Sequence, residues 1–252
     1  MKAVILCGGK GLRMRGAAGF TCKPLVEVGG MPVLWHVMKI YKEYGINEFI
    51  LCLGHGGDQI KEYFLNLDWK SSDFHMHGDG GIHFFNPPEK WDIVFADTGL
   101  KTMTGGRIKG IQKYIEEEEF MLTYGDGVAD IPLDQLLKHH RDKGKIATVT
   151  AVKNRSQYGI IEVKNGLAES FKEKPMLDGW INAGFYVFKR KIFDYLSHDS
   201  CVLEEGPLKA LVRENQLAVY RHEGFWQAVD TAKDVELINK LWASRRRPWV
   251  RW

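Results

Sequence analysis

Short apolar runs alternate with amphipathic stretches through the first 150 residues. Runs with the length of buried strands lie at 2–6, 48–53, 93–97, 119–123 and 146–152. Between them, apolar positions recur at helical spacing at about 32–44, 57–66, 105–116 and 133–142. This alternation predicts βαβ units, with parallel strands and helices on both faces of the sheet. An apolar stripe in the first helix should pack in the core, and it consists of Leu34, Val37, Met38 and Tyr41.

The pattern changes after residue 151. Short β-like runs follow at 159–163, 168–171 and 181–188, and one more strand is indicated near 216–222. Helical stretches lie around 203–214 and 231–244. There is no linker, internal repeat or low-complexity segment. The chain therefore predicts one domain over residues 1–252: a Rossmann-like three-layer α/β sandwich with a mostly parallel mixed sheet and a small C-terminal β-rich and helical part.

A glycine-rich segment follows the first strand. Leu6 ends the apolar run, and Gly8, Gly9 and Gly11 then come within four positions, with Arg13 shortly after. Glycines let backbone N–H groups approach an anion closely, and a polyphosphate is the anion most often held in this way. The spacing matches neither the P-loop nor the dinucleotide fingerprint. A nucleotide loop of another kind is predicted.

A second polar group follows a different strand. Gly125-Asp126-Gly127 comes directly after the run that ends at Tyr124. In parallel α/β sheets ligands bind at the carboxyl ends of the strands, so Asp126 and the glycine loop should face one crevice. Taken by themselves, Asp126 could be a turn residue and Asp230 the N-terminal residue of the last helix.

Several motifs in a fixed order resemble the sugar-1-phosphate nucleotidyltransferases. They are the opening G-G-K-G-L-R with Lys23-Pro24-Leu25-Val26-Glu27-Val28-Gly29-Gly30, then 97–107, 123–130, Phe171-Lys172-Glu173-Lys174-Pro175, 224–231 and 247–252. Together they are most similar to the glucose-1-phosphate cytidylyltransferase branch. The resemblance implies the nucleotide-diphospho-sugar transferase fold, with residues 1–150 mainly binding nucleotide and 151–252 mainly binding the sugar phosphate.

The resemblance also implies the chemistry. A sugar-phosphate oxygen attacks the α-phosphorus of CTP in line and expels pyrophosphate, so positioning and charge neutralisation are the main tasks of the protein. Arg13, Lys23, Asp126 and Asp230 are the expected catalytic residues, and the two aspartates would share one Mg²⁺. The nucleotide would also contact Leu6, Gly8, Gly9, Gly11, Thr104, Gly105, Arg107, Tyr124 and Gly125. The acceptor would contact Tyr158, Gly159, Glu173, Lys174 and Asn182.

The chain departs from this branch mainly in its second half. Gln157-Tyr158-Gly159-Ile160 lies where close relatives have an Arg-Phe-Gly sequence, Ala183 replaces a glycine, and Leu203 replaces the tryptophan of a Trp-Glu pair. The transfer chemistry is therefore better defined than the acceptor, which is glucose 1-phosphate or another phosphorylated small molecule. A non-catalytic nucleotide-binding regulator is the alternative from another class, and the retained cations and carboxylates argue against it.

Composition sets the remaining expectations. A net charge of +3 does not indicate a nucleic-acid partner, and no apolar stretch is long enough for a membrane helix. The four cysteines form no C-x-x-C pair and suit a reducing cytoplasm. His75, His77 and His83 near Asp79 are interpreted as surface histidines rather than a metal site. The long segment from Ser71 to Lys90 is an insert or a subunit contact, and a homo-oligomer is expected.

Overall fold

The structure is a computed structural model that describes residues 1–9, 22–67, 72–85, 90–155 and 158–252. In this part of the chain the central sheet has seven strands in the order β14-β10-β13-β8-β1-β4-β7. The strands are β1 (Lys2–Leu6), β4 (Glu48–Leu53), β7 (Asp92–Asp97), β8 (Glu119–Tyr124), β10 (Ala147–Arg155), β13 (Met176–Lys189) and β14 (Leu217–His222). Of these seven, β13 runs antiparallel to both of its neighbours. The predicted mixed, mostly parallel sheet is confirmed.

Helices cover both faces of this sheet. Alternate residues of β1 point to opposite sides, so Ala3 and Ile5 belong to one core cluster and Val4 and Leu6 to the other. The first cluster includes residues of α1 (Val33–Lys42), α2 (Gly57–Leu65), α5 (Leu133–Lys143) and α7 (Ala232–Ala243). The second includes residues of α4 (Thr104–Gly110), η4 (Arg190–Tyr195) and α6 (Pro207–Arg213). The predicted α1 stripe lies in the first cluster, fully buried.

Two helix boundaries differ from the pattern-based prediction for physical reasons. The helix expected over 105–116 ends at Gly110 and continues as a separate 3-10 turn, η3 (Gln112–Tyr114), because glycine weakens a helix interior. The helix expected from residue 203 begins at Pro207, whose missing N–H and fixed φ favour the first helical position. Within the described part of the chain, no helix is both long and apolar enough to cross a bilayer.

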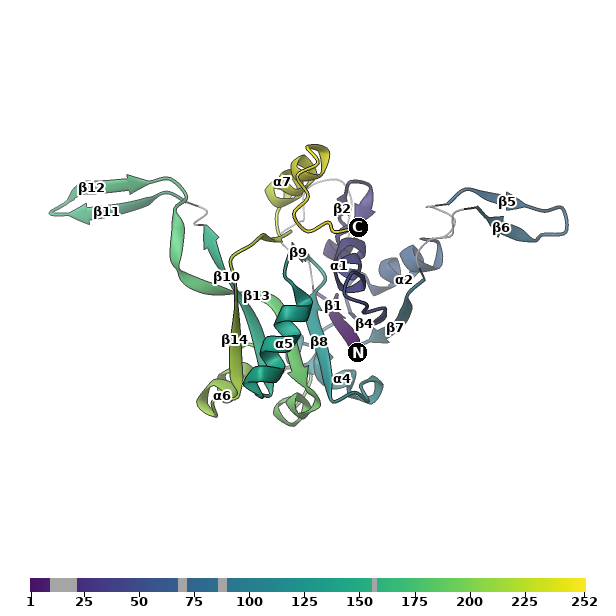
Figure 1. Cartoon of the computed structure of the whole chain (residues 1–252), viewed down its shortest axis with the longest axis horizontal. Helices are drawn as coiled ribbons and strands as arrows, with labels where there is room; N and C mark the ends of the chain where they lie inside the picture. The colour runs from purple at the N-terminus through teal and green to yellow at the C-terminus, as the bar shows by residue number, and fades with distance from the viewer. Residues whose placement is uncertain (10–21, 68–71, 86–89, 156–157) are drawn as a thin grey trace.

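Two antiparallel ribbons project from opposite sides of this body (Figure 1). One joins β5 (Phe74–Met76) to β6 (Ile82–Phe84), within the long polar segment before Lys90. The other joins β11 (Ile160–Lys164) to β12 (Leu167–Lys172). Its Asn165-Gly166 turn has φ values of 50° and 81°, as a two-residue hairpin requires. After residue 150, β10, β13 and β14 extend the main sheet itself.

Candidate active site

A rigid turn carries Lys23 to the carboxyl ends of the strands. Lys23 begins η2 (Lys23–Leu25), whose geometry is set by Pro24 and by the hydrogen bond from Leu25 N to Cys22 O, 2.9 Å. The Lys23 ammonium lies 2.5 Å from Asp230 Oδ1 and 3.6 Å from Asp126 Oδ2. The structure thus brings together one cation and two carboxylates, three residues that the sequence analysis selected.

The two carboxylates are joined by a short ribbon. β9 (Gly127–Ala129) follows Asp126 and pairs antiparallel with β15 (Trp226–Ala228), which leads to Asp230. The ribbon is closed by the hydrogen bond from Val229 N to Asp126 O, 2.7 Å. Antiparallel pairing therefore fixes the separation of two carboxylates that are far apart in the sequence.

Charge is concentrated at this point. Burial raises the pKa of the Asp126 carboxyl, the Lys23 ammonium lowers it, and the neighbouring Asp230 raises it again. Two carboxylates that converge on one cation form an oxygen-rich donor set of the kind that Mg²⁺ binds through one or two carboxylates and substrate phosphates. The residues present therefore fit a magnesium ion held by Asp126 and Asp230.

The loop of Asp230 is held from the helix side. Asp234, in the first turn of α7, accepts hydrogen bonds from Asp230 N (3.1 Å), Thr231 N (2.8 Å) and Thr231 Oγ1 (2.7 Å). Thr231 and Asp234 form a capping box at the start of α7. The T-x-x-D pattern is a helix-start signal that could have indicated this contact from the sequence.

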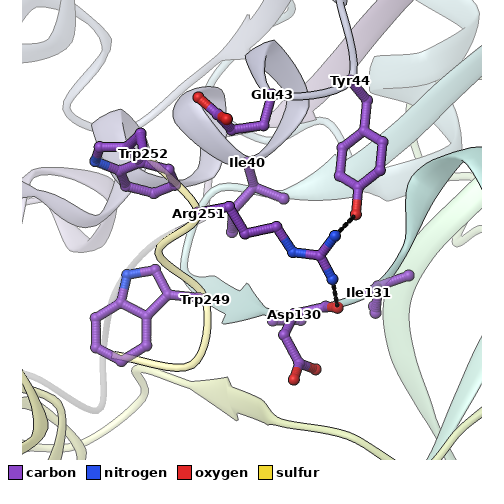
Figure 2. Close-up of a pocket in the computed structure, with 9 residues that line it drawn as sticks. Ile40, Glu43, Tyr44, Asp130, Ile131, Trp249, Arg251 and Trp252 are labelled. Carbon is purple, nitrogen blue, oxygen red and sulfur yellow. Dashed lines mark hydrogen bonds between the residues drawn. The ribbon is translucent and has the colours of Figure 1, made fainter. Parts of the chain in front are cut away.

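The far end of β9 is held by the C-terminal tail. Figure 2 shows the Arg251 guanidinium between two partners, the Tyr44 hydroxyl at 2.5 Å and the Asp130 carbonyl oxygen at 3.2 Å. The Asp130 carboxylate also accepts from His222 Nε2 and from Phe225 N, each at 2.7 Å. These contacts immobilise the residue that ends the short segment begun by Asp126.

A cleft of about 530 Å³ opens beside this charged group. Its walls come from the ends of β1 and β8 and from the loop before α4. The proposed metal ligand Asp126 lines it, as do six residues that the sequence assigns to the nucleotide: Leu6, Gly8, Gly9, Thr104, Arg107 and Tyr124. Gly105 and Gly125 instead pack closely, since an added Cβ would lie 2.6 Å from Cys201 Sγ and 3.1 Å from Cys7 Sγ, respectively. Gly11 and Arg13 lie outside the described residues.

Arg107 has a visible structural task. Its guanidinium donates to Gly8 O (2.9 Å), Leu53 O (2.8 Å) and Thr98 Oγ1 (2.7 Å). It therefore ties together the carboxyl ends of β1, β4 and β7. Gly8 is required at this place because an added Cβ would lie 2.2 Å from Arg107 Cζ. A role of Arg107 toward the base stays a prediction.

The predicted acceptor residues lie elsewhere. Glu173 and Lys174 pair with each other at 3.5 Å at the base of the β11–β12 ribbon, with side chains 61% and 56% exposed. Tyr158 is 76% exposed, and Gly159 packs against Phe171. Asn182 is also exposed, but it lies in β13 of the main sheet and donates from Nδ2 to the Tyr186 hydroxyl at 2.5 Å.

A polar contact behind the cleft has no local signal in the sequence. The Glu204 carboxylate accepts from the hydroxyls of Tyr124 and Thr104, across 80 and 100 positions. Tertiary packing brings the partly buried Glu204 to these hydroxyls, and no periodicity or spacing along the sequence predicts the contact. His75, His77 and His83 have exposed side chains on or beside the β5–β6 ribbon, as their interpretation as surface histidines expects.

The fold is a layered α/β sandwich in which one cation and two carboxylates meet at the strand ends. The chain matches the nucleotidyl transferase family model over residues 2–241 and belongs to that family. It is 48% identical to a probable glucose-1-phosphate cytidylyltransferase of Bacillus subtilis (strain 168) and 41% identical to the glucose-1-phosphate cytidylyltransferase of Salmonella typhimurium. Each alignment covers 100% of both chains. The resemblance found in the sequence motifs is confirmed.

Solved structures agree on the fold. HddC from Yersinia pseudotuberculosis in complex with GMP-PN superposes with a TM-score of 0.69 at 21% identity, covering 96% of this chain and 99% of that one. The inositol-1-phosphate CTP transferase of T. maritima gives 0.63 at 16% identity and 95% coverage of each chain. At these identities the likeness concerns the architecture.

Proposed function

We propose that this protein transfers the cytidylyl group of CTP to a sugar 1-phosphate, with glucose 1-phosphate as the first choice of acceptor. The products are a CDP-sugar and pyrophosphate. The observation that carries the proposal is identity of 48% and 41% to glucose-1-phosphate cytidylyltransferases over the full length of both chains. The site supports it, because Lys23, Asp126 and Asp230 converge beside a cleft large enough for a nucleotide.

The chemistry is a single in-line displacement. A phosphate oxygen of the acceptor forms a bond to the α-phosphorus of CTP, and the bond from that phosphorus to the pyrophosphate oxygen breaks. Lys23 neutralises charge on the α-phosphate, and Arg13 stabilises the leaving pyrophosphate. Asp126 and Asp230 hold Mg²⁺, which supplies further neutralisation of phosphate charge when it is bound.

Base selection is assigned to the loop and helix start at 103–107. Leu100, Met103 and Thr104 line the cleft there. A site that pairs its polar groups with one base edge discriminates strongly against a base that leaves them unpaired. The acceptor is assigned to Asn182 on β13 of the main sheet and to Tyr158, Gly159, Glu173 and Lys174 at the base of the ribbon.

The test is pyrophosphate release with CTP, UTP, dTTP and GTP against a panel of sugar phosphates and non-sugar phosphates. We expect the highest kcat/KM for CTP with glucose 1-phosphate. Equal kcat/KM for dTTP and CTP would move the enzyme to another branch of the family. A different best acceptor is the second candidate function, and the exposure of Glu173 and Lys174 favours testing it.

We also propose that the chain works as a homo-oligomer in a reducing cytoplasm. The β11–β12 ribbon exposes large apolar side chains, with Val163 at 69%, Leu167 at 75% and Phe171 at 63%. A two-stranded ribbon is marginally stable by itself in water, so a second copy is its natural cover. Light scattering should find an oligomer that a Leu167→Ser/Phe171→Ser variant weakens, and a wild-type monomer would contradict this.

A further inference from the structure

A continuous chain of hydrogen-bonded side chains runs behind the cleft. Thr104 Oγ1 donates to Glu204 Oε2 at 3.0 Å, and the Tyr124 hydroxyl donates to Glu204 Oε1. The Tyr186 hydroxyl interacts with that of Tyr124 and accepts a hydrogen bond from Asn182 Nδ2 at 2.5 Å. This hydrogen-bonded network therefore extends from Thr104, in the wall of the cleft, to Asn182 on β13, which is proposed for the acceptor.

Donors and acceptors can be assigned at the Glu204 end of this network. Tyr124 has a single hydroxyl proton, which it donates to Glu204. On the other side of Glu204, Leu203 N donates to Thr104 Oγ1 at 2.9 Å, and the Thr104 hydroxyl donates its hydrogen bond to Glu204. Both branches thus end on the same carboxylate.

Two hydroxyls donate to the side chain at position 204, and a carboxylate accepts both hydrogen bonds better than an amide does. Ionised glutamate offers two acceptor oxygens and no donor, whereas glutamine would turn an N–H₂ toward a hydroxyl proton. Tyr186 is fully buried. Burial, then Tyr186 and Glu204, raise the pKa of Tyr124, so its hydroxyl keeps the proton that it donates. In a low-dielectric setting such a network is stiff when every member is satisfied.

We propose that Glu204 is a positioning residue that holds both walls of the active site. It orients Thr104 and Tyr124, which line the cleft, and through the two tyrosines it orients Asn182. Glu204 itself is not among the described residues that line the cleft, so it acts through its neighbours. This role rests on the proposed function, because it assigns Thr104 to CTP and Asn182 to the acceptor.

Steady-state kinetics of Glu204→Gln tests the role, with Glu205→Gln as the control from the same turn, where the side chain is exposed. We expect Glu204→Gln to raise the KM for CTP and the KM for glucose 1-phosphate each about tenfold, as for loss of one charged hydrogen bond. Thr104→Val should raise mainly the KM for CTP, and Tyr186→Phe mainly that for glucose 1-phosphate. Glu205→Gln should match the wild type.

The double variant Glu204→Gln/Thr104→Val separates positioning from general destabilisation. Both substitutions remove the same bond, so the double variant should have a KM for CTP within about twofold of Glu204→Gln. If the increases in the KM for CTP caused by the two single substitutions multiply in the double variant, the proposal is overturned. So would a Glu204→Gln variant with a lowered melting temperature and both KM values unchanged, since its role would then be structural only.

Failure of the proposed function has a different signature, because the wild type would then release no pyrophosphate with CTP and any acceptor tested. In that case calorimetric titration of wild type and variants with the four nucleoside triphosphates decides the matter. Glu204→Gln should weaken the tightest-bound nucleotide about tenfold. Unchanged binding, or no nucleotide binding by the wild type, overturns the positioning role.

Discussion

The two halves of the active site are built in different ways. Lys23, Asp126 and Asp230 are carried by short elements at the strand ends of a sheet that is covered by helices on both faces. Glu173 and Lys174 are carried by the base of a two-stranded ribbon and are more than half exposed. The charged group thus lies within the body, and most of the residues proposed for the acceptor lie beside the ribbon.

This difference follows from what each half must do. In the proposed reaction, nucleotidyl transfer at the α-phosphorus depends on groups held in place before the substrates arrive, which a closed body with satisfied hydrogen bonds provides. The residues proposed for acceptor selection lie mostly at the base of an exposed ribbon. Substitutions in each half should therefore change different kinetic constants.

Removing either carboxylate should abolish turnover. Asp126→Ala and Asp230→Ala should each lower kcat by about 10³-fold or more, because each removes a charged ligand worth several kcal/mol in the transition state. Circular dichroism should remain that of the wild type. Asp142→Ala is the matched control, since Asp142 is an exposed aspartate on α5 paired with Lys138. Near-normal pyrophosphate release from either variant would contradict the assignment.

The two lysines should differ in the kinetic constant that they affect. Lys23→Ala should lower kcat about 100-fold, because its charge acts on the reacting phosphate. Lys174→Ala should raise the KM of the acceptor about tenfold and leave CTP binding intact, since it holds a group that is bound before and during reaction. Lys172→Ala, an exposed lysine on the same ribbon, is the control. If Lys174→Ala weakens CTP binding and spares the acceptor, the division into halves is wrong.

Substitution of Arg107 tests whether the cleft depends on the hydrogen bonds that join the ends of β1, β4 and β7. Arg107→Lys cannot reproduce three bonds to Gly8, Leu53 and Thr98, so we expect a loss of about 2 kcal/mol in unfolding free energy. For a chain of this size that corresponds to a fall of several degrees in melting temperature. Thermal melts and the kcat/KM ratio of CTP to UTP should be measured together. A changed ratio with an unchanged melt would favour base reading instead.

The pH dependence of stability should come from the body, not from the ribbons. Burial lowers the pKa of His36 and of His140 to about 4, so the unfolded chain binds more protons than the folded chain between pH 6.5 and pH 4. Unfolding free energy should therefore fall as pH drops from 7 to 5, by at most about 2 kcal/mol per histidine. Urea titrations at both pH values measure this. A His36→Gln/His140→Gln variant that keeps the full slope would contradict it.

The sequence pattern predicted the body of the molecule well. Each predicted strand of the first 150 residues is present, because buried strands and amphipathic helices have local periodicities. The pattern placed the ends of some helices incorrectly, where Gly110 and Pro207 act through backbone geometry. The motifs selected Lys23, Asp126 and Asp230, and the structure brings them within ion-pair distance, although their catalytic roles stay predictions.

The family, the layered fold and the cations and carboxylates proposed to act on phosphate could therefore be predicted from the sequence alone. These depend on short-range spacing, glycine placement and periodicity, which can be read along the chain. The tertiary structure decided which distant groups share a partner. Lys23 pairs with Asp230, which is 207 positions away in the sequence. The Glu204 carboxylate accepts hydrogen bonds from the hydroxyls of Thr104 and Tyr124, which are 100 and 80 positions away. Such pairings depend on strand order and on the burial that it creates, neither of which a local pattern contains.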